Sequence, residues 1–222
     1  MIAVRRRRKE EIPTVDEAAE TLTQAETALA RWESEAAGKA REAEALAAEL
    51  VERQARAGED LLDDAEWESV TAALSGMAER LASLETQQRL AVQAADAARG
   101  QVDPARRDLL RARAGTLKAQ AAELREAAAV RQAKTDQLLA ALADWEGTSF
   151  QPAVVRSVGG GTFHNRTRTQ AALDQADALV KEANSLIKLA ADGRPEQVRQ
   201  RAGRALPAVS DVARLVLDSV RS

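Results

Sequence analysis

The sequence predicts an all-α protein: long antiparallel helices form a three-helix, coiled-coil-like bundle, and a small helical cluster follows at the C-terminal end. Of its 222 residues 50 are alanine, and only 2% are aromatic. Such small side chains let helices approach closely but cannot fill a thick globular interior. The β-branched and aromatic residues that favour strands are sparse. Apolar residues also recur at coiled-coil spacing over the first two thirds of the chain.

The first long helix is predicted to begin after Pro13. Thr14 and Glu17 have the spacing of a capping box, in which each side chain accepts a hydrogen bond from the other residue's backbone N–H. Gly58 is the expected end of this helix. One apolar stripe recurs every seven residues, at Val15, Leu22, Leu29, Ala36, Ala43, Leu50 and Ala57. Its companion stripe is interrupted twice, at Ala18, Ala25, Trp32, Lys39, Leu46 and Arg53.

Two further long helices are predicted, over 63–100 and 104–147. Asp63 offers a cap for the first, and Asp103 with Pro104 is typical of the start of the second. The stripe of the first runs through Trp67, Val70, Leu74, Met77, Leu81, Leu84, Gln88, Ala91 and Ala95. That of the second runs through Leu110, Ala114, Leu117, Ala121, Leu124, Ala128, Arg131, Thr135, Leu138, Leu142 and Trp145. Because the two stripes differ in phase, we expect a turn at 100–103.

Short connections make successive helices antiparallel. Residues 13–147 should therefore form an up-down-up bundle. This topology would place Trp67, Leu138, Trp145, Leu61 and Leu62 at the same end of the bundle. Leu22, Leu29, Leu50, Leu74, Leu81, Leu117 and Leu124 are the expected buried leucines.

Residues 148–165 break the helical pattern with Pro152 and three consecutive glycines, so we expect a linker or a short hairpin there. They separate the bundle from a small basic helical region, 166–222. In that region Thr167 should cap one helix, Pro195 should begin a second, and Pro207 or Ser210 a third. The expected inward face of the first is Leu173, Ala176, Val180, Ala183, Ile187 and Ala190. Residues 1–12 are predicted to be a disordered basic arm.

The charge is unevenly distributed although its net value is only −3. Residues 1–12 hold five basic and two acidic side chains, and residues 148–222 hold eleven and seven. The body between them holds 16 basic and 26 acidic side chains. An acidic body with basic ends attracts anionic partners only at those ends.

Few residues are suited to catalysis or metal binding. The chain has no cysteine and a single histidine, His164, so thiolate sites, multi-histidine sites and cysteine nucleophiles are excluded. The acidic residues from Asp60 to Glu68 lack the alternation and central glycine of a calcium loop. We therefore expect no enzyme, no cofactor and no metal site.

Two basic groups are the candidate binding residues. The arm, Arg5, Arg6, Arg7, Arg8 and Lys9, could neutralise phosphates of nucleic acid or of an anionic surface without reading sequence. Arg199, Arg201 and Arg204 lie on a segment expected to fold, and could bind a protein partner.

In layout, the acidic helices and basic helical end resemble viral scaffolding proteins, which engage their shell protein through a small basic helical end. The resemblance implies a structural or assembly protein, of a phage particle for instance, that binds a protein partner and forms homo-oligomers. The alternative hypothesis is a sequence-independent nucleic-acid or anionic-surface binder that acts through the arm. No segment is long and apolar enough to span a membrane, and the expected location is the cytoplasm, or the virion if the protein is viral.

Overall fold

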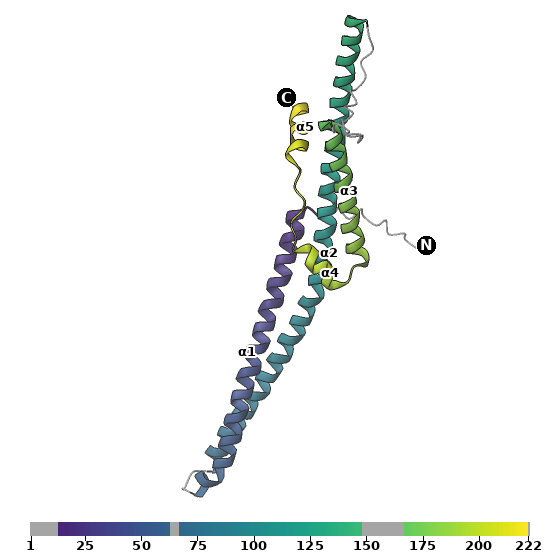
Figure 1. Ribbon diagram of the computed structural model, residues 1–222. Coiled ribbons are helices and arrows are strands. Elements are labelled where there is room, and N and C mark those ends of the chain that lie inside the picture. Colours follow the sequence, from purple (N-terminus) through teal and green to yellow (C-terminus); the bar gives the residue numbers. More distant parts are fainter. Residues whose placement is uncertain (1–12, 63–66, 148–166, 222) are drawn as a thin grey trace, which may run out of the picture. The chain divides into compact units, whose positions relative to one another are not determined.

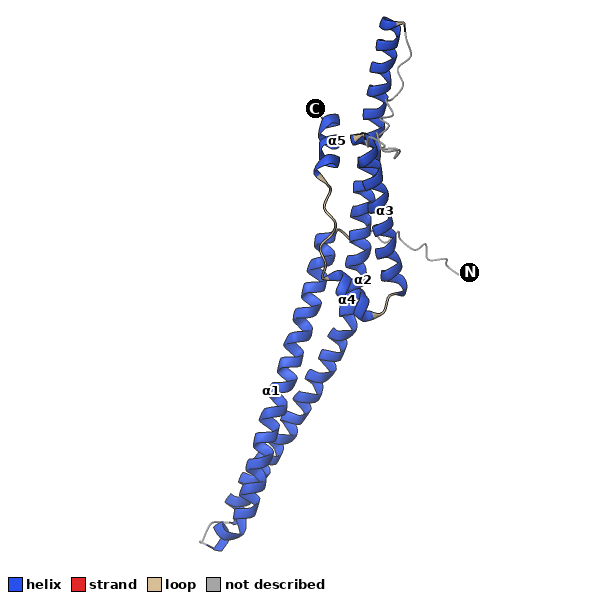
Figure 2. Ribbon diagram, in the orientation of Figure 1, coloured by secondary structure: helices blue, strands red, loops and turns tan. Residues whose placement is uncertain are grey.

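The computed structural model describes residues 13–62, 67–147 and 167–221 (Figure 1). It contains α1 (Val15–Leu62), α2 (Trp67–Glu146), α3 (Arg168–Asp192), α4 (Pro195–Ala202) and α5 (Asp211–Arg221). The regular secondary structure in these ranges is entirely helical, and no strand is present there (Figure 2). The all-α prediction, with long packed helices and a small C-terminal helical cluster, is confirmed.

The chain divides into two compact units, and the division falls within α2. The hairpin unit is residues 19–105, and the cluster unit is residues 13–18 together with residues 106–221. The sequence placed its boundary instead at 148–165, which lies outside the described residues, as do the arm at 1–12 and the predicted cap at Asp63. Each unit is described separately below.

In the hairpin unit, α1 and α2 run antiparallel and pack along small side chains (Figure 1). Its buried residues are mostly alanine: Ala25, Ala43, Leu84, Ala91, Ala95, Ala98, Val102 and Ala105. The predicted seam leucines Leu22, Leu29, Leu50, Leu74 and Leu81 are only half-buried. Two helices cannot surround a seam on all sides, so these leucines keep some exposure to solvent.

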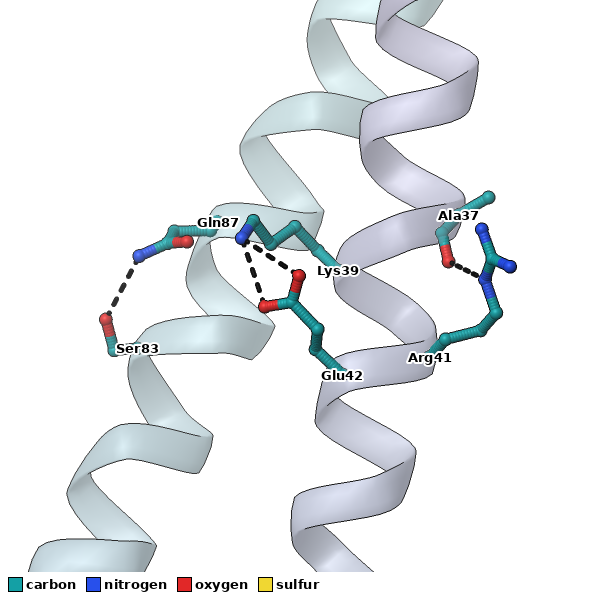
Figure 3. Close-up of polar contacts among 6 residues, drawn as sticks. All are labelled: Ala37, Lys39, Arg41, Glu42, Ser83 and Gln87. Atoms are coloured by element: carbon teal, nitrogen blue, oxygen red, sulfur yellow. Dashed lines mark hydrogen bonds and ion pairs between the residues drawn. The ribbon is translucent and has the colours of Figure 1, made fainter.

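Most polar contacts in the hairpin unit stabilise a single helix. Lys39 Nζ lies 3.1 Å from Glu42 Oε2, and Gln87 Nε2 lies 3.4 Å from Ser83 Oγ, each within one helix (Figure 3). Arg99 links the two helices, because it pairs with Glu33 of α1 at 2.8 Å and with Asp96 at 2.6 Å. The hydrogen bond with Glu33 is the main reason why the pKa of Arg99 is raised.

The predicted turn at 100–103 is wrong, because α2 continues through Gly100 and Pro104. Pro104 has no N–H to donate to the carbonyl of Gly100, so one helical hydrogen bond is missing there. The buried face nevertheless continues without a break, through residues spaced three and four apart: Ala91, Ala95, Ala98, Val102, Ala105, Leu109 and Ala112. Burial on both sides of Pro104 therefore outweighs its preference for a helix start.

The apolar stripe changes phase near residue 103 because a different face of α2 is buried after this point. A second buried stripe begins at Leu110 and continues through Ala114, Leu117, Ala121, Leu124 and Ala128. At 100° per residue this stripe lies about 110° around the helix from the first one. The expectation that Trp67, Leu138 and Trp145 share one end is also wrong, since they lie at opposite ends of one helix.

The ends of the long helices are predicted with mixed success. The capping box is confirmed: Thr14 N donates to Glu17 Oε2 at 2.8 Å and Glu17 N donates to Thr14 Oγ1 at 3.3 Å. Gly58 does not end α1, which extends to Leu62. Gly147 follows the end of α2 with a φ of 65°, a left-handed conformation that glycine adopts without steric cost.

The cluster unit has the larger core. Its largest fully buried side chains are Leu110, Leu117, Leu124, Leu186, Val198 and Val216. Buried alanines of α3, among them Ala172, Ala176 and Ala183, let the backbone of α3 pack close to the neighbouring helices. The cap at Thr167 is confirmed, since its Oγ1 accepts from Gln170 N at 3.1 Å.

The predicted faces of the short helices are partly wrong. Ile187 of α3, which was expected to face inward, is 40% exposed, whereas its neighbour Leu186 is buried. Ser210, and not Pro207, precedes the last helix, where its Oγ accepts from Ala213 N at 3.4 Å. With alanine at many positions, a one-residue change in the buried face alters the apolar pattern very little.

Candidate protein-binding groove

Two arginines of α2 hold the C-terminal ends of the short helices. The last carbonyls of a helix have no partner within the helix and carry its negative dipole end. Arg107 donates to the carbonyls of Ala190 and Gly193 at the end of α3, both at 2.9 Å. Arg113 donates to the carbonyl of Ala202, the last residue of α4, at 2.7 Å and to that of Arg204, just after α4, at 3.0 Å. These bonds fix α4 and the start of the segment that follows it.

The neighbourhood of Arg113 is positively charged. Burial, and then the charge of Arg201, lower the pKa of Arg113. Arg201 is itself half-buried and forms an ion pair with Glu182 of α3. Glu182 is thus one carboxylate beside three arginines, Arg113, Arg201 and Arg204, so the local charge stays positive.

The segment from Gly203 to Ser210 is attached to α3 by one side chain. Gln175 Oε1 accepts from the backbone N–H of Ser210 at 3.2 Å and from its hydroxyl, while Gln175 Nε2 donates to the carbonyl of Ala208 at 3.2 Å. An amide side chain can satisfy a donor and an acceptor of one extended segment in this way. The segment is therefore held beside α3 without being part of a helix.

An open groove of about 520 Å³ lies between α3, the end of α4 and this segment. Six of its ten lining residues are apolar, including Leu179, Leu206 and Pro207. Arg201, Arg204, Glu182 and Gln175 supply the polar part of its lining. The groove therefore combines an apolar surface with an excess of positive charge, and it can accommodate an apolar side chain next to a carboxylate.

The structure brings only two of the three predicted partner-binding arginines to this groove. Arg204 is exposed and lines it, and Arg201 lines it while paired with Glu182. Arg199 is exposed on α4 and is not among the lining residues. Arg5, Arg6, Arg7, Arg8 and Lys9 lie outside the described residues.

Sequence reasoning missed Gln175 and Glu182, which line the groove, and Arg107 and Arg113, which hold the ends of α3 and α4. Each acts on a segment at least 19 residues away in sequence. Their spacing on their own helices does not distinguish them from solvated surface residues. The one signal in the sequence was the density of arginine from 106 to 113 on a helix with an acidic body.

Neither a metal site nor a membrane-spanning helix is found among the described residues. Over 13–62, 67–147 and 167–221, no group of three or more histidine or acidic side chains is arranged to hold a metal ion. Within the same part of the chain, none of the helices has an apolar run that would let it cross a bilayer. No protein-family model matches the sequence, and no match was found among curated proteins or solved structures.

Proposed function

We propose that the chain is a non-enzymatic structural or assembly protein of the scaffold type, of a phage particle for instance, that engages a protein partner through its basic C-terminal helices. The groove beside α4 is the observation that carries this proposal. It is apolar over most of its lining, has an exposed arginine at position 204, and is held open by the bonds from Arg113 and Gln175. A groove fixed in this way loses little conformational entropy when a partner segment binds.

The groove fits a partner segment that places an acidic side chain next to an apolar one. Arg204 would pair with the acidic group, and Leu179, Leu206 and Pro207 would contact the apolar side chain. Because Arg201 already has Glu182 as a partner, Arg204 contributes most of the charge that a ligand can use. Arg199 does not line the groove and would not contact a segment bound there.

Peptide display tests this proposal even though the partner is unidentified. A random peptide library would be selected on the full chain, and the selected peptides would be measured against Arg204→Glu and Arg89→Glu chains. Arg89 is an exposed arginine of α2 in the hairpin unit and serves as the matched control. We expect acidic-apolar peptides whose affinity falls about tenfold or more with Arg204→Glu and stays unchanged with Arg89→Glu. Peptides that bind both variants equally would contradict the proposal.

The second candidate function is sequence-independent binding of nucleic acid or an anionic surface. The run of five basic residues from Arg5 to Lys9 favours it, because each lysine or arginine that neutralises a phosphate releases counterions. The two functions use different parts of the chain, so they can be separated by deleting the arm or by changing Arg204.

A further inference from the structure

The core-facing stripe of α2 in the cluster unit extends beyond the helices that cover it. Leu110, Leu117 and Leu124 are fully buried and spaced seven residues apart. The same stripe continues at this spacing to Arg131, Leu138 and Trp145, and the neighbouring stripe of Ala114, Ala121 and Ala128 continues to Thr135 and Leu142. The face that forms the core therefore extends for two more heptads.

The described helices that cover this stripe of α2, namely α3 and α5, end near residue 134 of α2. α3 runs antiparallel to α2, and Asp177 pairs with Arg125 at 2.7 Å. Arg168, nine residues earlier in α3, therefore lies opposite about residue 134 of α2, because both helices rise equally per residue. α5 ends at Arg221, and Arg131 already reaches its Ser219 at 3.1 Å. Figure 1 shows the end of α2 extending beyond α3 and α5.

The uncovered stretch exposes large apolar side chains. Leu138 is 72% exposed, Trp145 is 81% exposed and Leu142 is 39% exposed. Single exposed leucines are ordinary on protein surfaces. Three large apolar side chains in register with a buried core are not, and such a patch is typical of an interaction site.

The stretch is complementary to itself when two copies run antiparallel. Its inward positions, Thr135, Leu138, Leu142 and Trp145, have spacings of three, four and three, which read the same from either end. A twofold axis near residue 140 therefore places Leu138 against Leu142 of the second copy, and Thr135 against Trp145 of the second copy.

The charges flanking the stripe favour the antiparallel orientation over the parallel one. Arg131 and Lys134 outnumber Asp136 in the first half of the stretch, which therefore has a net charge of +1, and Asp144 and Glu146 give the far end a net charge of −2. An antiparallel pair brings the basic end of each copy toward the acidic end of the other, whereas a parallel pair brings like charges together.

We propose that residues 132–146 of α2 are a self-association surface, on which a second copy of this chain docks antiparallel. The uncovered stretch has the length that the pairing from Thr135 to Trp145 requires, so the α3 helix of neither copy lies in the way. Four layers bury less area than the roughly 1,200–2,000 Å² of a stable interface, so the dimer is weak and depends on concentration. This self-association surface is distinct from the groove, and the proposal does not depend on the function proposed for the groove.

Sedimentation velocity of the full chain over a wide concentration range is the first test. We expect the wild type to shift toward the dimer mass as concentration rises, and a Leu138→Asp chain to remain monomeric. Leu138 is exposed, so this change leaves the fold intact. Val51→Asp, at a 65% exposed position of α1, is the matched control and should associate like the wild type. A dimer that persists in the Leu138→Asp chain would overturn the proposal.

Disulfide trapping tests the register, because the chain has no cysteine of its own. A mixture of Leu138→Cys and Leu142→Cys chains should form a covalent heterodimer faster than either chain forms a homodimer. Preferred trapping of two Leu138→Cys chains would establish a parallel register and overturn the proposed one. The fluorescence of Trp145, obtained as the difference between the wild-type and Trp145→Phe spectra, reports whether the stripe is covered. If the chain stays monomeric and Trp145 emits like a buried indole, another segment of the same chain covers the stripe and the proposal fails.

Discussion

Arginines of α2 add to the local glycine caps at the ends of two helices that are distant in sequence. Arg107 and Arg113 each donate to two or more carbonyls at the end of a short helix. Hydrogen bonds from a charged donor are stronger than neutral ones. A few long side chains can therefore order a helix of eight residues, which is too short to be stable alone.

Replacing Arg113 with Met should destabilise the cluster unit, because the carbonyls of Ala202 and Arg204 lose their charged donor. We expect the free energy of unfolding to fall by about 1–3 kcal/mol, as measured by urea denaturation. Arg111→Met is the control, since Arg111 is exposed and pairs only locally with Asp108, and it should change stability by about 0.5 kcal/mol or less. Equal effects of the two substitutions would mean that Arg113 does not hold α4.

The capping box makes the start of α1 sensitive to pH. The backbone N–H of Thr14, and then its hydroxyl, hold the pKa of Glu17 below its ordinary value. A carboxyl whose pKa is lower in the folded state stabilises the helix above its unfolded pKa and loses this contribution as pH falls through its folded pKa. Backbone chemical shifts from Val15 to Ala18 should therefore lose helical character in acid. In a Glu17→Ala chain the first turn should be frayed already at neutral pH, and an unchanged pH response in that chain would contradict the assignment.

At the scale of elements, the existence and type of the helices could be predicted from the sequence, but their number and some ends could not. The caps at Thr14 and Thr167 were recognised because their bonds are local. The continuity of α2 was missed because the signal at Asp103 and Pro104 is local, whereas the burial of Val102, Ala105 and Leu109 that overrides it is tertiary. The groove could not be predicted because it is lined by α3 and by residues 201–208, which Arg113 of α2 holds in place across 89 residues of sequence.

The continuity of α2 predicts that Pro104→Ala stabilises the protein. Proline in a helix interior is about 3 kcal/mol less favourable than alanine, so the free energy of unfolding should rise by up to about this amount. Pro195→Ala is the matched control, because Pro195 is the first residue of α4, where the missing N–H is not needed. Urea denaturation followed by circular dichroism measures both. A loss of stability in Pro104→Ala would favour the turn that the structure lacks.

The two units should also respond differently to truncation of a leucine. Leu117 is fully buried in the cluster unit, and its replacement by alanine should lower the free energy of unfolding by about 2–5 kcal/mol. Leu81 is half-buried in the hairpin unit, so Leu81→Ala should have a clearly smaller effect. Thermal melts of the two variants make the comparison, and a larger effect at Leu81 would mean that another surface covers the hairpin seam.

At the scale of the whole molecule, the distribution of charge separates the two candidate functions. If the arm binds phosphates, deleting residues 1–9 should weaken binding to any duplex regardless of its sequence. The slope of log K against log salt should flatten by about 0.9 for each lost contact, hence by roughly 4 to 5 for five contacts. Fluorescence anisotropy with a random-sequence duplex at several salt concentrations measures this slope.

For an assembly protein we expect the opposite dependence. Deleting the arm should leave oligomeric mass and peptide binding unchanged, because neither the groove nor residues 132–146 of α2 include it. Arg204→Glu should then weaken peptide binding about tenfold or more, since Arg204 is the exposed charge in a groove whose other arginine is already paired with Glu182. We favour this outcome because the groove is a folded surface that combines apolar and charged side chains, and the arm offers charge alone. Tight, salt-sensitive duplex binding that is lost with the arm, together with peptide binding indifferent to Arg204→Glu, would reverse the preference.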